Sequence, residues 1–345
     1  MDRWGERLEE LAREVLPESV HRYVRQGARD GVSAVEAVAA WEKFRLLPAV
    51  LRDVTEVDCS TQLLGTPVSS PFGIAPTTMQ RAAHREGELA MATAAASRDT
   101  LMVVSSNAGT TFEEIAATGV AWWLQVYVPS DRLACMPLLD RAVDAGASAI
   151  VLTADTPVVG TKYDQGHETV WDIADSAWLR ANFPDGYDEL PGHEKAVDLG
   201  PHDIDWLRKT TGLPVVVKGV LRPNDARRCV DAGAAAVWVS NHGGRQLDRT
   251  AAPADCLAGV VATVGDEAEV YVDGGVRNAS HGLAALALGA SGVFLGRSPL
   301  YALAVGGSEG VTRLLDGFHE ELVEAMRLAG CNRLHAITPE LLAPS

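Results

Sequence analysis

The sequence predicts a (β/α)8 TIM barrel with an N-terminal helical extension and a long lid loop after the fourth strand. Eight short apolar segments alternate with helical patterns along the 345 residues, and eight such strand–helix units close a barrel. The segments are rich in β-branched and aromatic residues, as in strands buried on both faces. They span residues 72–76, 101–105, 122–127, 149–155, 214–219, 236–241, 269–275 and 292–297.

The first forty residues are expected to be helical. Leu8, Leu11 and Val15 recur at helical spacing. Ser33 and Glu36 match a capping box, in which each side chain bonds the other residue's backbone, so a further helix is predicted to begin there. A β-rich stretch over 57–68 follows and contains a turn at Gly65.

Helices are predicted between the strands, for example over 131–145, 223–232 and 279–288. These helices run into Gly146, Gly233 and Gly289, and glycine after a helix permits the left-handed turn that ends it. An open doubly wound sheet is the alternative fold. It requires a glycine-rich turn after the first strand, and residues 76–79 contain no glycine.

A single domain is predicted over residues 1–345, with the extension over 1–70 and the barrel over 71–330. The lid spans 156–203 within the barrel. It is rich in Gly, Pro, Asp and Trp and has no strong periodicity. A segment of this length in a compact domain is typical of a lid or a disordered flap.

The composition excludes several classes of partner. The formal net charge of −16 argues against nucleic acid and anionic membrane surfaces, so local cations must attract any anionic substrate. The five cysteines are scattered without C-x-x-C spacing, which is typical of reduced thiols and not of disulfides or a zinc site. No apolar signal segment begins the chain, and no apolar run approaches the ~18 residues of a membrane span. A soluble cytoplasmic protein is expected.

Polar or ionisable side chains follow every predicted strand. Because barrel active sites lie at the carboxyl ends of the strands, these side chains are expected to share one mouth. They are Thr77, Thr78, Ser105, Ser106, Asn107, Gln125, Tyr127, Thr153, Asp155, Lys218, Ser240, His242, Arg245, Asp273, Arg277 and Arg297.

The segment 240–248, Ser-Asn-His-Gly-Gly-Arg-Gln-Leu-Asp, is the most informative of these strand ends. It holds a candidate base, His242, and a fixed cation, Arg245, separated by glycines that let both side chains face one small anion. Residues 273–277 (Asp-Gly-Gly-Val-Arg) and 296–297 (Gly-Arg) follow strands seven and eight, where barrels usually bind phosphate. They predict a phosphorylated cofactor or substrate; the alternative is that the glycines only form turns and the arginines are solvated.

These motifs resemble the FMN-dependent α-hydroxy acid oxidases and dehydrogenases, the family of glycolate oxidase, lactate oxidase and mandelate dehydrogenase. The resemblance covers nearly the whole chain except the lid, and the string at 240–248 is highly specific. It rests on Leu16-Pro17, Tyr23, Ala75-Pro76-Thr77, Gln125-Val126-Tyr127, Thr153-Ala154-Asp155-Thr156-Pro157, Lys218-Gly219 and the segments 240–248, 273–277 and 296–297.

The resemblance implies that FMN is bound across the barrel mouth. Arg297 and the backbone at Gly275 and Gly296 are expected to hold its phosphate, with Arg277 close by. Lys218 is expected near N1 and the C2 oxygen of the flavin, where negative charge builds on reduction. The other residues expected to bind the cofactor are Pro76, Thr77, Thr78, Ser105, Gln125, Tyr127, Thr153, Ser240, Asp273 and Gly274.

The resemblance also implies oxidation of a 2-hydroxy acid to the 2-oxo acid. His242 is expected to be the base, and Asp155 to hold its imidazole and stabilise its protonated form. Arg245 and the Tyr23 hydroxyl are expected to bind the substrate carboxylate, and Tyr127 the substrate oxygen. Oxygen or another acceptor takes the electrons, and a homotetramer is expected.

The chain departs from the family pattern at a few positions. Lys162 stands where members carry a second arginine, and it is expected to bind substrate with charge but without bidentate geometry. Thr78 replaces a small residue against the flavin, and Asn107 replaces a tryptophan, which predicts a more polar and more open pocket. The lid side chains His167, Trp171, Trp178 and Tyr187 are expected to pack the flap and not to bind substrate.

Other functions are compatible with the same residues. In one alternative, the substrate is a 2-amino acid or a larger natural-product intermediate. A second alternative is a Schiff-base aldolase that uses Lys218. A third is a flavin-binding barrel without turnover, against which the complete set of predicted catalytic residues argues.

Overall fold

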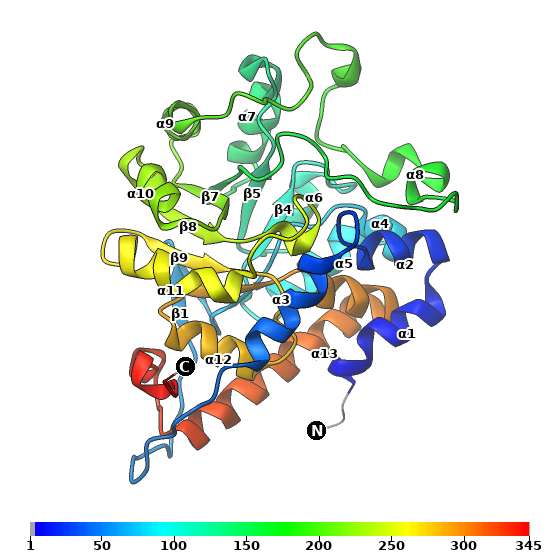
Figure 1. Ribbon diagram of the computed structural model, residues 1–345. Helices are drawn as coiled ribbons and strands as arrows, with labels where there is room; N and C mark the ends of the chain where they lie inside the picture. Colours follow the sequence, from blue (N-terminus) through cyan, green and yellow to red (C-terminus); the bar gives the residue numbers. More distant parts are fainter. Residues whose placement is uncertain (1–3, 345) are drawn as a thin grey trace.

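The computed structural model describes residues 4–344 and contains a closed barrel of eight parallel strands (Figure 1). Every strand pairs with its neighbours in chain order, and β10 closes the ring against β3, with Leu295 beside Ile74. All eight predicted strands are confirmed, and most end earlier than predicted because their last polar residues already belong to loops. The strands are β3 (Phe72–Ile74), β4 (Met102–Ser105), β5 (Trp122–Val126), β6 (Ile150–Thr153), β7 (Val215–Val220), β8 (Ala236–Val239), β9 (Glu269–Val272) and β10 (Gly292–Leu295).

Large aromatic side chains fill the barrel interior. Trp123, Trp238, Tyr271 and Phe294 are fully buried, and the rings of Trp238 and Phe294 lie 4.0 Å apart between centroids. Gly73 leaves room for this layer, since a Cβ there would lie 2.5 Å from the Phe294 ring. The interior is therefore packed, and a ligand can bind only at an end of the barrel.

Helices surround the barrel, and the predicted glycine ends are confirmed. Gly146, Gly233 and Gly289 have φ of 90°, 96° and 97°, in the left-handed region. The last helix, α13, bends where Gly306 and Gly307 leave the helical conformation. Within residues 4–344, no helix has the length and apolar character that crossing a membrane requires. The outer helices are α4 (Gln80–Ala83), α5 (Gly87–Ala96), α6 (Phe112–Ala116), α7 (Met136–Asp144), α9 (Pro201–Thr211), α10 (Pro223–Asp231), α11 (Pro253–Val264), α12 (Ala279–Ala287) and α13 (Arg297–Ala329).

The N-terminal segment forms α1 (Leu8–Val15), α2 (Glu18–Arg25) and α3 (Val32–Glu42), followed by a hairpin of β1 (Thr61–Leu63) and β2 (Thr66–Val68). The helices are confirmed, but the predicted capping box at Ser33 is wrong. Ser33 lies buried in the first turn of α3, where its N–H donates to Asp248 Oδ1 at 3.0 Å. The acceptor comes from the 240–248 loop, so α3 is tied to that loop and not capped locally.

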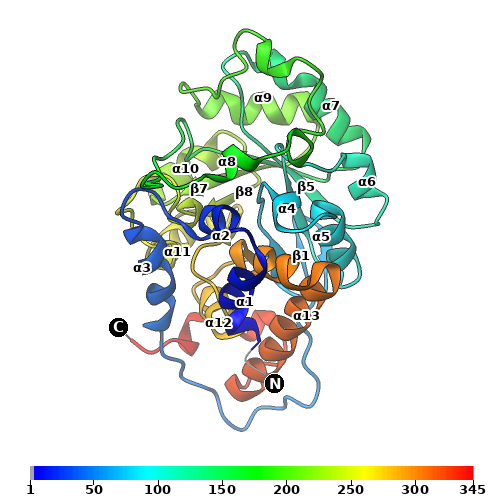
Figure 2. The same ribbon diagram turned by 90° about the vertical axis from the view of Figure 1, so that its right-hand side faces the viewer.

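The lid contains α8 (Val170–Ile173) and short 3-10 turns at Ser176–Trp178 and Tyr187–Glu189. In Figures 1 and 2, α8 lies beside α2 above the carboxyl ends of the strands. The Trp171 and Tyr23 rings meet edge to face, with centroids 5.9 Å apart. The lid and α2 together therefore border the mouth of the barrel.

Candidate active site

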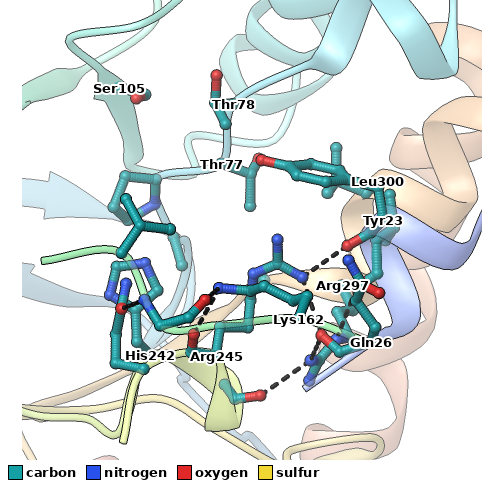
Figure 3. A pocket seen from close by; sticks show the side chains of 18 of the residues that line it. Tyr23, Gln26, Thr77, Thr78, Ser105, Lys162, His242, Arg245, Arg297 and Leu300 are labelled. Carbon is teal, nitrogen blue, oxygen red and sulfur yellow. Dashed lines mark hydrogen bonds between the residues drawn. The ribbon is translucent and has the colours of Figure 1, made fainter. Parts of the chain in front are cut away.

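A cavity of about 630 Å³ opens at the carboxyl ends of the strands, between the barrel, α2 and the lid (Figure 3). This volume lies within the roughly 300–1,000 Å³ of small-molecule and cofactor sites. Of the predicted strand-end and site residues, Ser106 is buried and does not line the cavity. All the others line it except Asp155 and Ser240. Those two lie behind the wall and hydrogen-bond to His242, which does line it.

The His242 backbone adopts a left-handed conformation, with φ of 57°, which is unusual for a residue with a side chain. Its N–H donates to Ser240 Oγ at 3.0 Å, and Asn241 Oδ1 accepts from the Gly244 N–H. Gly244 packs against α3, where a Cβ would lie 2.4 Å from the Ala34 nitrogen. The loop therefore requires glycine at position 244, and it places the His242 imidazole at the edge of the cavity.

His242 Nδ1 lies 2.9 Å from Asp155 Oδ1, and Thr156 Oγ1 donates to the same carboxylate oxygen. Burial, together with the charges of Lys218 and Arg245, lowers the pKa of His242, although Asp155 acts in the opposite direction. Burial alone would raise the pKa of Asp155, but His242 and Lys218 hold it below its ordinary value. The pair therefore consists of a carboxylate and a neutral imidazole whose Nε2 is free to accept a proton.

Lys218 is buried at the centre of the site and is fixed from two sides. Its Nζ donates to Ser240 Oγ at 2.8 Å and lies 3.0 Å from Asp273 Oδ2. The other oxygen of Asp273 is buried without a hydrogen-bond partner among the described residues. A Schiff-base role requires a free amine, and this ammonium is held in an ion pair, so the geometry does not favour the aldolase alternative.

Uncharged polar groups form another part of the wall. Gln125 Nε2 donates to Thr153 Oγ1 at 2.9 Å, and Thr78 Oγ1 donates to the Asn107 carbonyl at 3.3 Å. Thr77, Thr78 and Ser105 face the cavity across from His242 and Arg245 (Figure 3). Two of the positions that depart from the family pattern, Thr78 and Asn107, thus lie in the cavity wall and hydrogen-bond to each other.

Two half-buried guanidinium groups lie at the end of the cavity beside β9 and β10. Arg297 donates to the carbonyls of Val24 and Gly243, at 3.0 and 2.9 Å, and Arg277 donates to its own neighbour Val276. Neither has a carboxylate partner among the described residues. Burial, then the charges of Arg245 and Arg277, lower the pKa of Arg297 to about 10. Partly buried cations without counter-ions are costly, so this end of the cavity is suited to a multiply charged anion.

The glycines beside these arginines have a packing role as well as an exposed backbone. Gly275 has φ of 81°, and a Cβ would lie 1.9 Å from the Ala37 carbonyl oxygen of α3. The N–H groups of Gly275 and Gly296 donate no hydrogen bond to the described backbone. These N–H groups are thus available to an anion, while contact with α3 explains why position 275 must be glycine.

Arg245 connects the 240–248 loop to α2. Its Nη1 donates to the carbonyls of Tyr23 and Gln26, at 2.6 and 3.0 Å, and its guanidinium lies 4.7 Å from the centre of the Tyr23 ring. No carboxylate pairs with it in residues 4–344. Arg245, Tyr23 and His242 border the same cavity, so a small carboxylate can reach all three (Figure 3).

The lid contributes lysines to this side of the cavity. Lys162 Nζ donates to the carbonyls of Gly160 and Arg245, both at 2.7 Å, which holds the beginning of the lid on the 240–248 loop. Lys195, which the sequence analysis did not identify, places its ammonium 3.8 Å from the centre of the Tyr127 ring. No local pattern could have revealed it, because an antiparallel bridge between Lys195 and Pro129 carries it to the end of β5.

The lid aromatics are only partly as expected. Trp178 packs among Val20, Met79 and Val170, and Tyr187 packs on Phe183, as predicted. Trp171 instead lines the cavity, because its contact with Tyr23 holds it at the mouth.

Comparison with known proteins agrees with this geometry. The family model for FMN-dependent dehydrogenase matches residues 12–344. The chain is 39% identical to 2-hydroxyacid oxidase 1 of Homo sapiens, over 97% of this chain and 94% of that protein. It is also 39% identical to L-lactate oxidase of Nostoc sp., over 97% and 96% of the two chains. A crystal structure of mandelate oxidase with 3,3-difluoro-2-hydroxy-3-phenylpropionic acid superposes with a TM-score of 0.90 at 37% identity, covering 98% of each chain.

Proposed function

This chain belongs to the FMN-dependent dehydrogenase family, and on that premise we propose that it oxidises a 2-hydroxy acid to the 2-oxo acid with bound FMN. The single observation that carries the proposal is the His242–Asp155 pair, which borders one cavity together with Arg245 and Lys218. A base, a carboxylate anchor and a buried cation are the groups that this oxidation requires.

The residues around the cavity fit FMN. Arg277, Arg297 and the N–H groups of Gly275 and Gly296 would hold its phosphate, because these guanidiniums lack a counter-ion in residues 4–344. Lys218, fixed by Ser240 and Asp273, would lie near N1 of the flavin. The ring and ribityl chain would contact Pro76, Thr77, Thr78, Ser105, Gln125, Tyr127, Thr153 and Gly274. When bound, FMN supplies the acceptor for the two electrons of the oxidation.

The protein side chains bind the substrate and move its proton. Arg245 and the Tyr23 hydroxyl hold the carboxylate next to the reacting carbon. His242 Nε2 accepts one of the two protons that the CH–OH group loses, and the Asp155 carboxylate stabilises the imidazolium that forms. Burial raises the pKa of Tyr127, so its hydroxyl stays protonated and donates to the substrate oxygen.

We further propose that oxygen is the electron acceptor and that the chain forms a single FMN-binding domain that assembles as a cytoplasmic homotetramer. The oxidase names of the similar proteins support the first part. The five cysteines are free, as is typical of a reducing compartment. Oxygen uptake during turnover tests the electron acceptor, and the mass of the protein in light scattering tests the tetramer.

Anaerobic mixing of the purified yellow protein with a panel of acids tests the main proposal. We expect 2-hydroxy acids to bleach the flavin absorbance and the 2-oxo acids to be recovered as products. In His242→Ala, flavin reduction should slow by roughly 10²–10⁴-fold, the contribution of a positioned base. Bleaching by 2-amino acids alone, or a colourless protein that cannot be reconstituted with FMN, would show that the proposal is wrong.

A further inference from the structure

Lys195 has an unusual environment for a lysine. It lies in the lid beside Pro129, and its ammonium sits over the Tyr127 ring at 3.8 Å inside the cavity wall. Its side chain is half-buried and makes no hydrogen bond or ion pair with any residue in 4–344, although the Asp155 carboxylate is close enough to act on its charge. A partly desolvated ammonium that lies on an aromatic face without a direct partner is available to bind an anion from the cavity.

The charges around the cavity leave this lysine without a directly paired counter-ion, since the nearby Asp155 carboxylate hydrogen-bonds to His242 and Thr156 instead. Lys218 is paired with Asp273, and Arg277 and Arg297 are suited to a phosphate. Arg245 would be neutralised by the carboxylate next to the reacting carbon. A monocarboxylic substrate therefore supplies no charge for the lid lysines Lys162 and Lys195.

We propose that the substrate carries a second carboxylate, which Lys195 binds with Lys162 nearby, so that this enzyme acts on 2-hydroxy dicarboxylic acids. The inference rests on the proposed 2-hydroxy acid oxidation and specifies its substrate class. Lys195 touches Tyr127, which lines the cavity with His242, so the second carboxylate lies only a short chain away from the reacting carbon.

The electrostatics of the two lysines agree with this assignment. Burial lowers the pKa of Lys195 to about 8, with the charge of Arg180 acting in the same direction and that of Asp155 opposing it. Burial, with the charges of Arg245 and Lys195, likewise lowers the pKa of Lys162 to about 8. A bound carboxylate would compensate both effects and restore the charged ammonium forms.

The test compares acids of equal chain length that differ in the distal group. Anaerobic flavin bleaching is measured with tartronate, malate and 2-hydroxyglutarate, and with lactate, 2-hydroxybutyrate and 2-hydroxypentanoate. For each acid we take the rate of flavin reduction divided by the dissociation constant. We expect this quantity to be about tenfold or more higher for the best diacid than for its matched monoacid, as for a site built around a polar group. Lys195→Met should lower this diacid preference by about tenfold or more, and Lys195→Arg should retain most of it.

Lys209→Met is the matched control, because Lys209 lies exposed on α9 in a pair with Asp205, away from the cavity. It should leave the diacid preference unchanged. Binding of glutarate against pentanoate, followed by the flavin spectrum, gives a readout that needs no turnover. The wild-type preference should fall as pH rises through about 8, since the ammonium loses its charge, and Lys195→Met should not show this fall.

Two failures are distinguishable. If monoacids and diacids reduce the flavin equally well and Lys195→Met leaves their ratio unchanged, the second carboxylate site is wrong and the oxidase assignment stands. If no 2-hydroxy acid of either series reduces the flavin, the proposed function fails and this inference fails with it. Circular dichroism and FMN content of each variant establish that it folds. If Lys195→Met does not fold, the binding of glutarate against pentanoate by the wild type decides the question.

Discussion

His242 shows how a single residue is prepared for its proposed role as the base. Its left-handed backbone is a conformation that costs of order 1–3 kcal/mol for a residue with a side chain, and such strain persists where surrounding contacts overdetermine it. Ser240 holds its N–H and Asp155 holds its Nδ1. The remaining nitrogen, Nε2, is left as the acceptor, and burial keeps the ring neutral by lowering its pKa.

The lowered pKa of His242 predicts how activity depends on pH. Since the neutral imidazole is the proposed base, kcat/KM should fall on the acidic side only below pH ~6.5, the ordinary pKa of histidine. Asp155→Asn removes the charge that raises the pKa of His242, so this acidic limb should move to lower pH. The rate of flavin reduction should also fall by roughly 10²–10⁴-fold, because the imidazole loses its orientation. Flavin reduction at each pH in stopped flow gives both values, and an acidic limb that stays in place in Asp155→Asn contradicts the pairing.

At the scale of elements, α3 supports the carboxyl-end loops from outside the barrel. Asp248 accepts from the first turn of α3, and Trp41 near its end donates to the Gly274 carbonyl at 2.7 Å. The Gly275 backbone lies directly against the helix. The helix therefore positions both the 240–248 loop and the loop after β9, which bring His242 and Arg277 to the cavity.

This contact makes Gly275 intolerant of a side chain. In Gly275→Ala the new Cβ would lie 1.9 Å from the Ala37 oxygen, and the residue would also be held at φ of 81°. We expect a loss of about 2 kcal/mol or more of unfolding free energy, together with weaker FMN binding. Gly317→Ala is the matched control: nothing lies within 4 Å of its Cβ, and within α13 it should be neutral or stabilising by about 0.5–1 kcal/mol. Urea unfolding measures both, and equal stability of the two variants would contradict the close contact.

At the scale of the whole molecule, the charge distribution opposes the net charge. The chain carries a formal net charge of −16, yet Arg245, Arg277 and Arg297 converge on one cavity. Like charges held together lower the stability of the fold until an anion binds between them. The proposed anion-binding end of the barrel would therefore lower the stability of the cofactor-free protein and raise its affinity for the anion.

Arg277→Met separates these two effects. Within residues 4–344 the Arg277 guanidinium bonds only to the Val276 carbonyl, so its removal relieves repulsion and leaves few groups unpaired. We expect the FMN-free protein to melt about 1–3 °C higher, while FMN binds roughly 10–100-fold more weakly. Arg228→Met, on the exposed surface of α10 beside Asp225, should change neither. Calorimetry with and without FMN decides the matter, and a cofactor-free variant that is less stable than the wild type would contradict the repulsion.

Local patterns were sufficient for the architecture and for much of the site. Alternating apolar and helical segments specify the barrel, because a strand buried on both faces must be apolar along its length. Barrel geometry then brings all strand ends to one mouth, so residues such as Lys218, His242 and Arg297 can be grouped from the sequence alone.

Contacts between distant segments decided the rest. Ser33 is a buried helix residue and not a cap, because its acceptor, Asp248, comes from another loop. Lys195 and Trp171 border the cavity only because the lid pairs with the end of β5 and packs on α2. A segment without periodicity does not predict such packing. The arginines could be read from the chain, but their lack of counter-ions is a property of their neighbours in space, which only the folded arrangement reveals.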